Sequence, residues 1–255
     1  MKRYILFIGL LCTFSNLIAQ KKVTEKQSSA NVENVYINLK FANNIIVKNW
    51  NKNEISVEAT VSIDDNKYND YFSLKSNKIG ETLKIASDYG DYFKKYRSYY
   101  SYKKHSHKED KKINDKKNND HTDDCHGRSH NNIVNYVIYV PKKMALKIKS
   151  ISGSVETDAY EGELNLDLIS GNITVKKHSK NMYLKTISGD IDVFISDATF
   201  EAKTLTGAVY SDLDIDFDKK YKKRSYGSKI IATINKGTAS LKLDTISGDI
   251  FLRKI

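Results

Sequence analysis

The chain contains a short turn sequence that recurs at a fixed interval. Each copy is an aliphatic residue followed by Ser or Thr and then Gly, and four copies in phase begin at Ile151, Ile169, Ile187 and Leu205. A fifth copy begins at Ile246, separated from the fourth by one interval plus an insertion. A repeat of about 18 residues with strand-like alternation is typical of a β-solenoid, because a single coil cannot bury its own apolar face.

The residues on either side of each turn repeat in the same phase. Before the turns, alternate positions recur one interval apart: Leu164, Leu166 and Leu168; Met182, Leu184 and Thr186; Phe200, Ala202 and Thr204. After the turns, Ile173 and Val175 recur as Ile191 and Val193. Each unit is therefore predicted to be a strand, a turn and a second short strand. Coils stacked about 4.8 Å apart would bury the aligned apolar columns in one core.

The turn residues have a predicted structural role. Their glycines suit a corner at which the backbone needs a positive φ: Gly153, Gly171, Gly189, Gly207 and Gly248. The hydroxyl residue before each glycine is expected to form a ladder along that corner: Ser152, Ser170, Ser188, Thr206 and Ser247. An antiparallel sandwich of short strands is the alternative, but the strict phase favours the solenoid.

The N-terminal region keeps the same interval without the Ser-Gly signature. Four apolar residues are each followed one interval later by another: Ile37, Leu39, Phe41 and Ile45, then Ile55, Val57, Ala59 and Ile63. Apolar residues make up 40% of the chain, which is enough for a core and excludes a wholly disordered protein. We therefore expect a single all-β solenoid domain over residues 20–255, with two insertions.

Residues 137–153, with the sequence VIYVPKKMALKIKSISG, lead directly into the repeated Ile-Ser-Gly-Asp/Asn-Ile units. This arrangement resembles the bacterial putative-adhesin domain family of unknown function, in which a Val-Pro-Lys strand precedes coils with a Ser-Gly-Asp-Ile signature. The resemblance covers residues 133–255 well and residues 32–85 loosely. It implies a right-handed, β-helix-like scaffold on or beyond the cell envelope, and the family has no established catalytic residues to transfer.

Residues 1–19 are typical of a secretory signal peptide. Lys2 and Arg3 precede an apolar run at residues 4–14, and cleavage is expected after Ala19. The run is too short to span a bilayer, and no second run of spanning length follows it. We expect an exported, soluble protein, periplasmic or at the cell surface, without a membrane span. Its one remaining thiol, Cys125, excludes an internal disulfide.

The net charge indicates an anionic partner. Lys and Arg number 42 against 31 Asp and Glu, a formal charge of +11. This excess invites a nucleic-acid hypothesis, but export makes intracellular nucleic acid an unexpected partner. The excess is concentrated on the two insertions rather than laid out as a groove-reading surface. An acidic glycan or another anionic envelope polymer is therefore the expected partner.

The two insertions have different characters. Residues 88–132 begin with a run of tyrosines, and from Lys103 onward Ile113 and Cys125 are the only apolar residues. Such a stretch cannot offset its ordering entropy, so a disordered charged excursion is predicted. Residues 212–230 alternate apolar and acidic residues and then turn through a basic tip, which predicts a β-hairpin standing off the coils.

The first insertion holds a candidate metal site. Imidazole and thiolate groups are ordinary ligands for zinc, copper or nickel, and six lie here: His105, His107, His121, Cys125, His126 and His130. Their spacing matches no tight structural zinc motif. A polar loop that is merely His-rich is the alternative, so an adventitious transition metal is the most that is expected, and no cofactor is.

Two acidic series are candidate sites with simpler explanations. The residue after each turn glycine forms a column: Ser154, Asn172, Asp190, Ala208 and Asp249. Stacked acids could bind calcium or serve a polysaccharide-cleaving β-helix enzyme, but turn chemistry accounts for Asn and Asp here. Alternate acids also share one strand face: Asp212, Asp214, Asp216 and Asp218. A solvated face that prevents edge pairing explains this second series.

Tyrosines interleaved with basic residues form the last candidate site. Tyrosine rings can stack on sugars while the cations meet carboxylate or phosphate groups. The candidate residues come from both insertions: Tyr96, Arg97, Tyr99, Tyr100, Tyr102, Lys222, Lys223 and Arg224. The alternative is a solvated loop without a partner.

These observations favour an exported, non-enzymatic β-solenoid that acts as an envelope scaffold or adhesin-like binding module. A carbohydrate-active β-helix enzyme and a metal-sequestering envelope protein are the alternatives. The sequence contains no nucleophile elbow, phosphate-binding loop, zinc-protease motif or dinucleotide fingerprint. Because solenoids need capped ends, the last coil is expected to be covered by a partner, a second copy or the hairpin.

Overall fold

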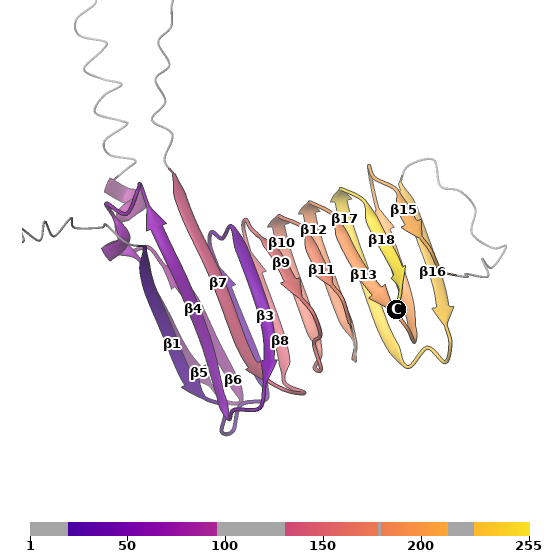
Figure 1. The fold of residues 1–255 in the computed structure, drawn as a ribbon, viewed down its shortest axis with the longest axis horizontal. Helices are drawn as coiled ribbons and strands as arrows, with labels where there is room; N and C mark the ends of the chain where they lie inside the picture. Colours follow the sequence, from indigo (N-terminus) through magenta and orange to yellow (C-terminus); the bar gives the residue numbers. More distant parts are fainter. Residues whose placement is uncertain (1–19, 96–130, 178–179, 214–226) are drawn as a thin grey trace, which may run out of the picture.

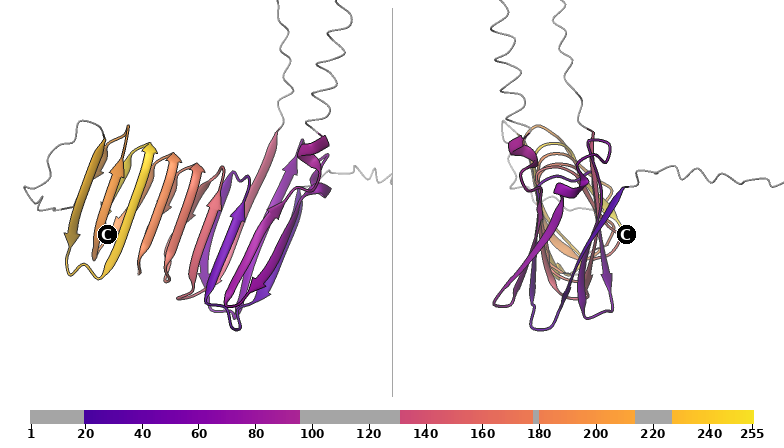
Figure 2. Two further views of the ribbon diagram at one scale, coloured as in Figure 1. Left: turned by 180° about the vertical axis from the view of Figure 1, so that it is seen from behind. Right: turned by 90° about the vertical axis from the view of Figure 1, so that its left-hand side faces the viewer.

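The strands of the protein run across its long axis and form two sheets that face each other (Figures 1 and 2). The computed structural model describes residues 20–95, 131–177, 180–213 and 227–255. Apart from a short 3-10 helix, η1 (Asn69–Tyr71), and one turn of α-helix at residues 92–95, the regular elements in these ranges are strands. The all-β class predicted from the sequence is confirmed.

Each sheet contains nine strands within the described residues. From the N-terminal end of the stack, sheet A runs β1 (Lys21–Ser28), β4 (Glu54–Ile63), β7 (Asn132–Pro141), β3 (Asn44–Trp50), β9 (Ser154–Thr157), β11 (Ile173–Val175), β13 (Ile191–Ile195), β18 (Ile250–Lys254), β15 (Val209–Ser211). From the same end, sheet B runs β5 (Ser73–Ile79), β6 (Thr82–Asp88), β2 (Asn34–Leu39), β8 (Ala145–Ser150), β10 (Leu164–Ser170), β12 (Met182–Ser188), β17 (Ala239–Ser247), β14 (Ala198–Thr204), β16 (Ser228–Ile234).

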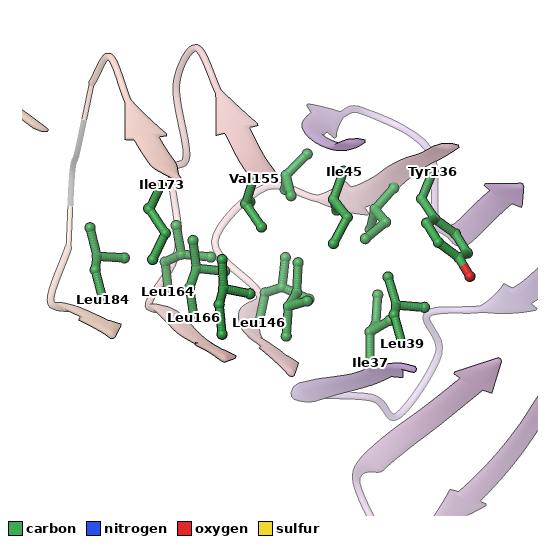
Figure 3. Close-up of a cluster of buried hydrophobic side chains, with 14 of the residues drawn as sticks. Ile37, Leu39, Ile45, Tyr136, Leu146, Val155, Leu164, Leu166, Ile173 and Leu184 are labelled. Carbon is green, nitrogen blue, oxygen red and sulfur yellow. The ribbon is translucent and has the colours of Figure 1, made fainter. Parts of the chain in front are cut away.

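The repeat corresponds to coils as predicted. In each unit a sheet B strand ends at the Ser-Gly turn, and the chain returns as a sheet A strand. Neighbouring units pair in parallel with an offset of one interval, so that Leu164 lies opposite Met182 and Ile173 lies opposite Ile191. The aligned columns face inward between the sheets, where Leu166 and Leu184 are fully buried (Figure 3). Burial of each such side chain contributes about 1.5–3 kcal/mol.

The predicted hydroxyl ladder is present only in part, since Ser152 Oγ donates to Ala42 O (3.2 Å) and Thr206 Oγ1 donates to Ile246 O (3.0 Å). A second row of hydroxyl groups lies two residues earlier. Thr186, Thr245 and Thr204 are buried, and their Oγ1 atoms donate hydrogen bonds of 3.0, 3.0 and 2.8 Å to glycine carbonyls of the neighbouring coils. The residues named from the sequence lie outside the core, as Ser188 and Ser247 show. The inward-facing threonines thus satisfy backbone carbonyls of the neighbouring coils from within the core.

The aliphatic residue that opens each turn also stays outside the core. These side chains are between 40% and 50% exposed: Ile151, Ile169, Ile187, Ile246 and Leu205. Successive side chains of a strand point to opposite faces of the sheet. The residue before each of these points into the core, so the aliphatic residue itself points outward. The apolar columns of the core are therefore those before and after the turn.

The fifth coil lies between the third and the fourth, so the coils do not stack in chain order. Leu241 of β17 pairs with Met182 of β12 on one side and with Phe200 of β14 on the other. The chain reaches this place because β16 runs back antiparallel to β14 before β17 begins. The prediction that Phe200 follows Met182 in the stack is therefore wrong.

The N-terminal recurrence does not reflect coil stacking either. Ile37 pairs with Ile85 and Ile148 in sheet B, whereas Ile55 lies in β4 of sheet A, antiparallel to β1 and β7. Strands β2 and β3 do form a coil, but its nearest neighbour is the β8–β9 coil, with Val35 opposite Leu146. Antiparallel strands close this end of the stack, and the recurrence of apolar residues there is incidental.

The first insertion begins later than predicted. Tyr89 and Tyr92 are buried, and Tyr89 packs edge-on against Phe41 and Phe72 at ring-centroid distances of 5.8 and 5.2 Å. Burial raises the pKa of the Tyr89 hydroxyl to about 12. These tyrosines thus belong to an aromatic cluster beside β6, and residues 96–130 lie outside the described structure.

The second insertion and the end of the stack also differ from expectation. The returning arm of the predicted hairpin is β16, which pairs with β14 rather than standing off the coils, because Ile230 and Ala232 pack against the core. Residues 214–226 lie outside the described ranges. Strand β18 lies between β13 and β15. The last coil in the sequence is therefore not the end of the stack, and it needs no partner to cover it.

Candidate functional site

Most site residues predicted from the sequence lie outside the described structure. This holds for the histidines and Cys125 of the metal hypothesis, for the tyrosines and Arg97 of residues 96–102, and for Lys222, Lys223 and Arg224. Metal binding and binding by these residues stay predictions. In the part of the chain that the structure does describe, no three His, Cys, Asp or Glu side chains are grouped to hold a metal ion.

The column after the turn glycines has a clear structural role. The backbone N–H of each residue donates to the side chain on the preceding coil: Asp190 N to Asn172 Oδ1 (2.9 Å), Asp249 N to Asp190 Oδ1 (2.8 Å) and Ala208 N to Asp249 Oδ1 (2.8 Å). These bonds explain the Asn and Asp residues through turn chemistry. Asp212 similarly accepts a bond from Lys254 N (2.6 Å), and the other three aspartates of its series lie outside the described residues.

The outer face of sheet B brings together a set of side chains that the sequence analysis missed. Outward-facing positions of neighbouring strands lie in one row because the strands pair in register. The pairs Tyr36–Lys147, Lys147–Asn165, Asn165–Tyr183 and Tyr183–Lys242 join five strands from β2 to β17. The row combines two aromatic rings, two ammonium groups and an amide, which are the groups that sugar and carboxylate ligands require.

The row borders an open groove of about 630 Å³ along the edge where the sheet B strands begin. The polar side chains of Asn34, Glu163, Asn181 and Ser240 line it, together with the row itself. Ser240 N donates to Asn181 Oδ1 at 2.9 Å, which fixes the orientation of this amide. Lys242 Nζ lies 5.4 Å from the ring centroid of Tyr183, so cation and ring form one unit.

Asn165 occupies the middle of the row. Its Oδ1 atom is buried and has no hydrogen-bond partner within the described residues. Buried polar atoms in native proteins are nearly always bonded, so Asn165 Oδ1 is an exception in the middle of this row.

The outer face of sheet B carries an excess of lysines. Seven face outward from β6 to β16: Lys84, Lys147, Lys149, Lys185, Lys203, Lys229 and Lys242. The acids on the same strands are Asp88, Asp167, Glu201 and Asp244. Three of these acids are paired, Asp88 with Lys75, Asp167 with Lys149 (3.3 Å) and Glu201 with Lys229 (2.9 Å). Among described residues, Lys84, Lys147, Lys185, Lys203 and Lys242 form no ion pair.

The ion pairs of sheet A are more evenly matched. Lys176 contacts Glu156 and Asp158, each at 2.8 Å, and hydrogen bonds to both raise its pKa above the ordinary lysine value. Arg253 Nε lies 2.7 Å from Asp192 Oδ1. On sheet B, the hydrogen bond from Lys229 lowers the pKa of the Glu201 carboxyl. Glu201 therefore stays ionised and paired with Lys229. Sheet A also has two exposed lysines without an ion pair, Lys22 and Lys48, so among the described strands unpaired lysines are more numerous on sheet B.

The sequence contains a partial signal for this row. Lys147, Asn165 and Tyr183 are spaced by the repeat interval, so writing the coils in register would have aligned them. Lys242 holds the same place, four residues before Ile246, but the repeat does not show that β17 lies next to β12. Tyr36 could not be found this way, because the pairing of β2 with β8 is not specified by the repeat. Within the described residues, no helix is long and apolar enough to cross a membrane.

Comparison with known proteins identifies relatives by fold and by family. The structure of a putative cell adhesion protein from Clostridium sporogenes is similar to this chain with a TM-score of 0.51 and 12% identity, over 92% of this chain and all of the other. A putative adhesin from Bacteroides fragilis matches with a TM-score of 0.37 and 9% identity, over 93% and 98% of the two chains. A comparison with curated proteins finds no match.

The first of these structures supports the fold, since its likeness extends over nearly the whole chain. The family model of Toastrack DUF4097 matches residues 138–253, which contain the five Ser-Gly or Thr-Gly turns. The resemblance to the putative-adhesin domain family is thereby confirmed. In residues 138–253, the chain is thus similar to the Toastrack DUF4097 family.

Proposed function

We propose that this protein is an exported, non-enzymatic binding module of the cell envelope that holds an anionic surface polymer on the outer face of sheet B. The observation that carries the proposal is the row of Tyr36, Lys147, Asn165, Tyr183 and Lys242 beside the groove. Unpaired lysines supply attraction for carboxylate or phosphate groups, and tyrosine rings supply stacking surfaces for sugars.

The relative with the similar fold supports a binding role. It is described as a putative cell adhesion protein, and adhesion is binding to molecules of another surface. We also propose that the coils are right-handed and that the signal sequence at residues 1–19 directs export. A catalytic role for Asp190 and Asp249 has less support, because one oxygen of each carboxylate accepts a backbone hydrogen bond.

Salt dependence tests the proposal on the wild-type protein. Residues 20–255 are expected to bind polygalacturonate, an acidic polymer, and the affinity should fall about tenfold or more between low and high salt, because ions screen exposed charges. Binding to neutral dextran, measured in parallel by calorimetry, should be weak and insensitive to salt. Equal affinity for both polymers, or salt-independent binding of polygalacturonate, would contradict the proposal.

A further inference from the structure

The row on sheet B repeats within itself. Tyr36 on β2 is followed by Lys147 on β8, and Tyr183 on β12 is followed by Lys242 on β17. In the strand order of sheet B, the second pair lies three strands beyond the first. At about 4.8 Å per strand, the two tyrosines and the two lysines are each separated by about 14 Å.

The groove has the same direction as this repeat. Its lining comes from six neighbouring strands, from Thr82 on β6 to Lys242 on β17, with only a few residues from each. The groove therefore runs across the strands, at the edge opposite the Ser-Gly turns. Figure 1 shows that these strands follow one another along the long axis of the stack. A globular partner would need a broad surface, whereas a groove that runs along the stack fits an extended chain.

We infer that the ligand is a linear acidic polysaccharide that lies along the stack and occupies the two Tyr–Lys pairs as two equivalent subsites. Each subsite stacks one sugar ring on its tyrosine and places one carboxylate beside its lysine. Asn165 lies on the strand between the two subsites. The inference rests on the proposed function, since it specifies the ligand of the same face.

Two subsites predict that stoichiometry depends on ligand length. An oligogalacturonate too short to reach from Tyr36 to Tyr183 can occupy either subsite, so two molecules should bind per protein. One that spans both should bind singly and more tightly, because its second contact is intramolecular. Affinity should then level off once both subsites are filled. A length series of oligogalacturonates measured by calorimetry reports affinity and stoichiometry together.

Variants of the tyrosines separate the subsites. Tyr36→Ala and Tyr183→Ala should each weaken the long oligomer about tenfold, and each should reduce the stoichiometry of the short oligomer from two to one. Tyr139→Ala, which removes an outward-facing tyrosine from sheet A, is the matched control and should change neither quantity. Tyr36→Phe and Tyr183→Phe keep the ring and should bind as the wild type does, while circular dichroism verifies that every variant is folded.

The outcomes distinguish this inference from the proposed function. Binding of every length with one site and one affinity would overturn the two-subsite inference while leaving an anion-binding face intact. Loss of long-oligomer affinity in only one of the two alanine variants would overturn it in the same way. Failure of all oligogalacturonates and of the polymer to bind would overturn the proposed function itself.

Discussion

Gly171→Ala is expected to lower the free energy of unfolding by about 3 kcal/mol or more, because strained backbone and overpacking each cost about 1–3 kcal/mol. Gly171 has a φ of +135°, which L side chains rarely adopt. A Cβ atom there would also overlap with the carbonyl of Gly153 on the neighbouring coil. Both groups belong to the backbone of turns that connect paired strands, so neither can move without disturbing the stack. Chemical denaturation followed by far-UV circular dichroism measures the loss.

The matched control is Gly80→Ala in the turn between β5 and β6. Gly80 has a φ of +58°, but a Cβ atom added there meets nothing within 4 Å. This variant should lose only about 1 kcal/mol, the cost of a positive φ alone. The difference in free energy of unfolding between the two variants therefore measures the cost of the backbone overlap between neighbouring coils. Equal losses at Gly171 and Gly80 would show that the coils are not packed backbone against backbone.

Leu243→Ala is expected to cost about 2–5 kcal/mol, as much as Leu166→Ala in the middle of the stack. Leu243 is fully buried and lies between Leu184 of β12 and Ala202 of β14. In a stack that followed chain order, Leu243 would belong to the last coil and would have a neighbouring coil on one side only. The size of the loss therefore tests the interleaved order.

Leu166→Ala provides the reference in the same measurement, since Leu166 is also fully buried and has coils on both sides. Losses of similar size for the two variants are the predicted result. A cost below about 1 kcal/mol for Leu243→Ala beside a full cost for Leu166→Ala would place β17 at an open end, against the structure.

The repeat predicted which residues lie opposite one another but not which coils are neighbours. The fixed interval sets the register, so Leu241 aligns equally well with Met182 and with Phe200. Order is decided by the antiparallel strand β16 and the turn after it, which carry the chain to the other side of β14. Nothing in the turn sequence Ile246-Ser-Gly248 specifies that place.

The N-terminal end shows a second limit of periodicity. Ile37 and Ile55 are separated by the repeat interval and are both buried, yet they lie in different sheets. Period-2 alternation predicts an inward side chain in parallel and antiparallel strands alike. The strand direction of β4 is determined by its partners β1 and β7, which are far from it in the sequence.

The candidate site was only partly visible in the sequence for a related reason. Charge counting directed attention to the basic insertions, whereas the described lysines of sheet B are spread over successive strands, with one or two on each. Lys147 and Tyr183 become neighbours of one groove only when β8, β10 and β12 are aligned. Tyr36 joins them from a distant part of the chain, through the pairing of β2 with β8.

Charge reversal on the outer faces of sheets A and B tests most directly the claim that sheet B carries the binding site. The double variant Lys147→Glu, Lys242→Glu changes the groove on sheet B, and Lys22→Glu, Lys48→Glu makes the same change in charge at exposed positions of sheet A. The dissociation constant for polygalacturonate, measured by calorimetry at low salt, should rise about tenfold or more in the first variant because two attractive contacts become repulsive. It should stay within about twofold of wild type in the second, because long-range attraction is screened. Equal weakening in both variants, or none in the first, would contradict a binding site on sheet B.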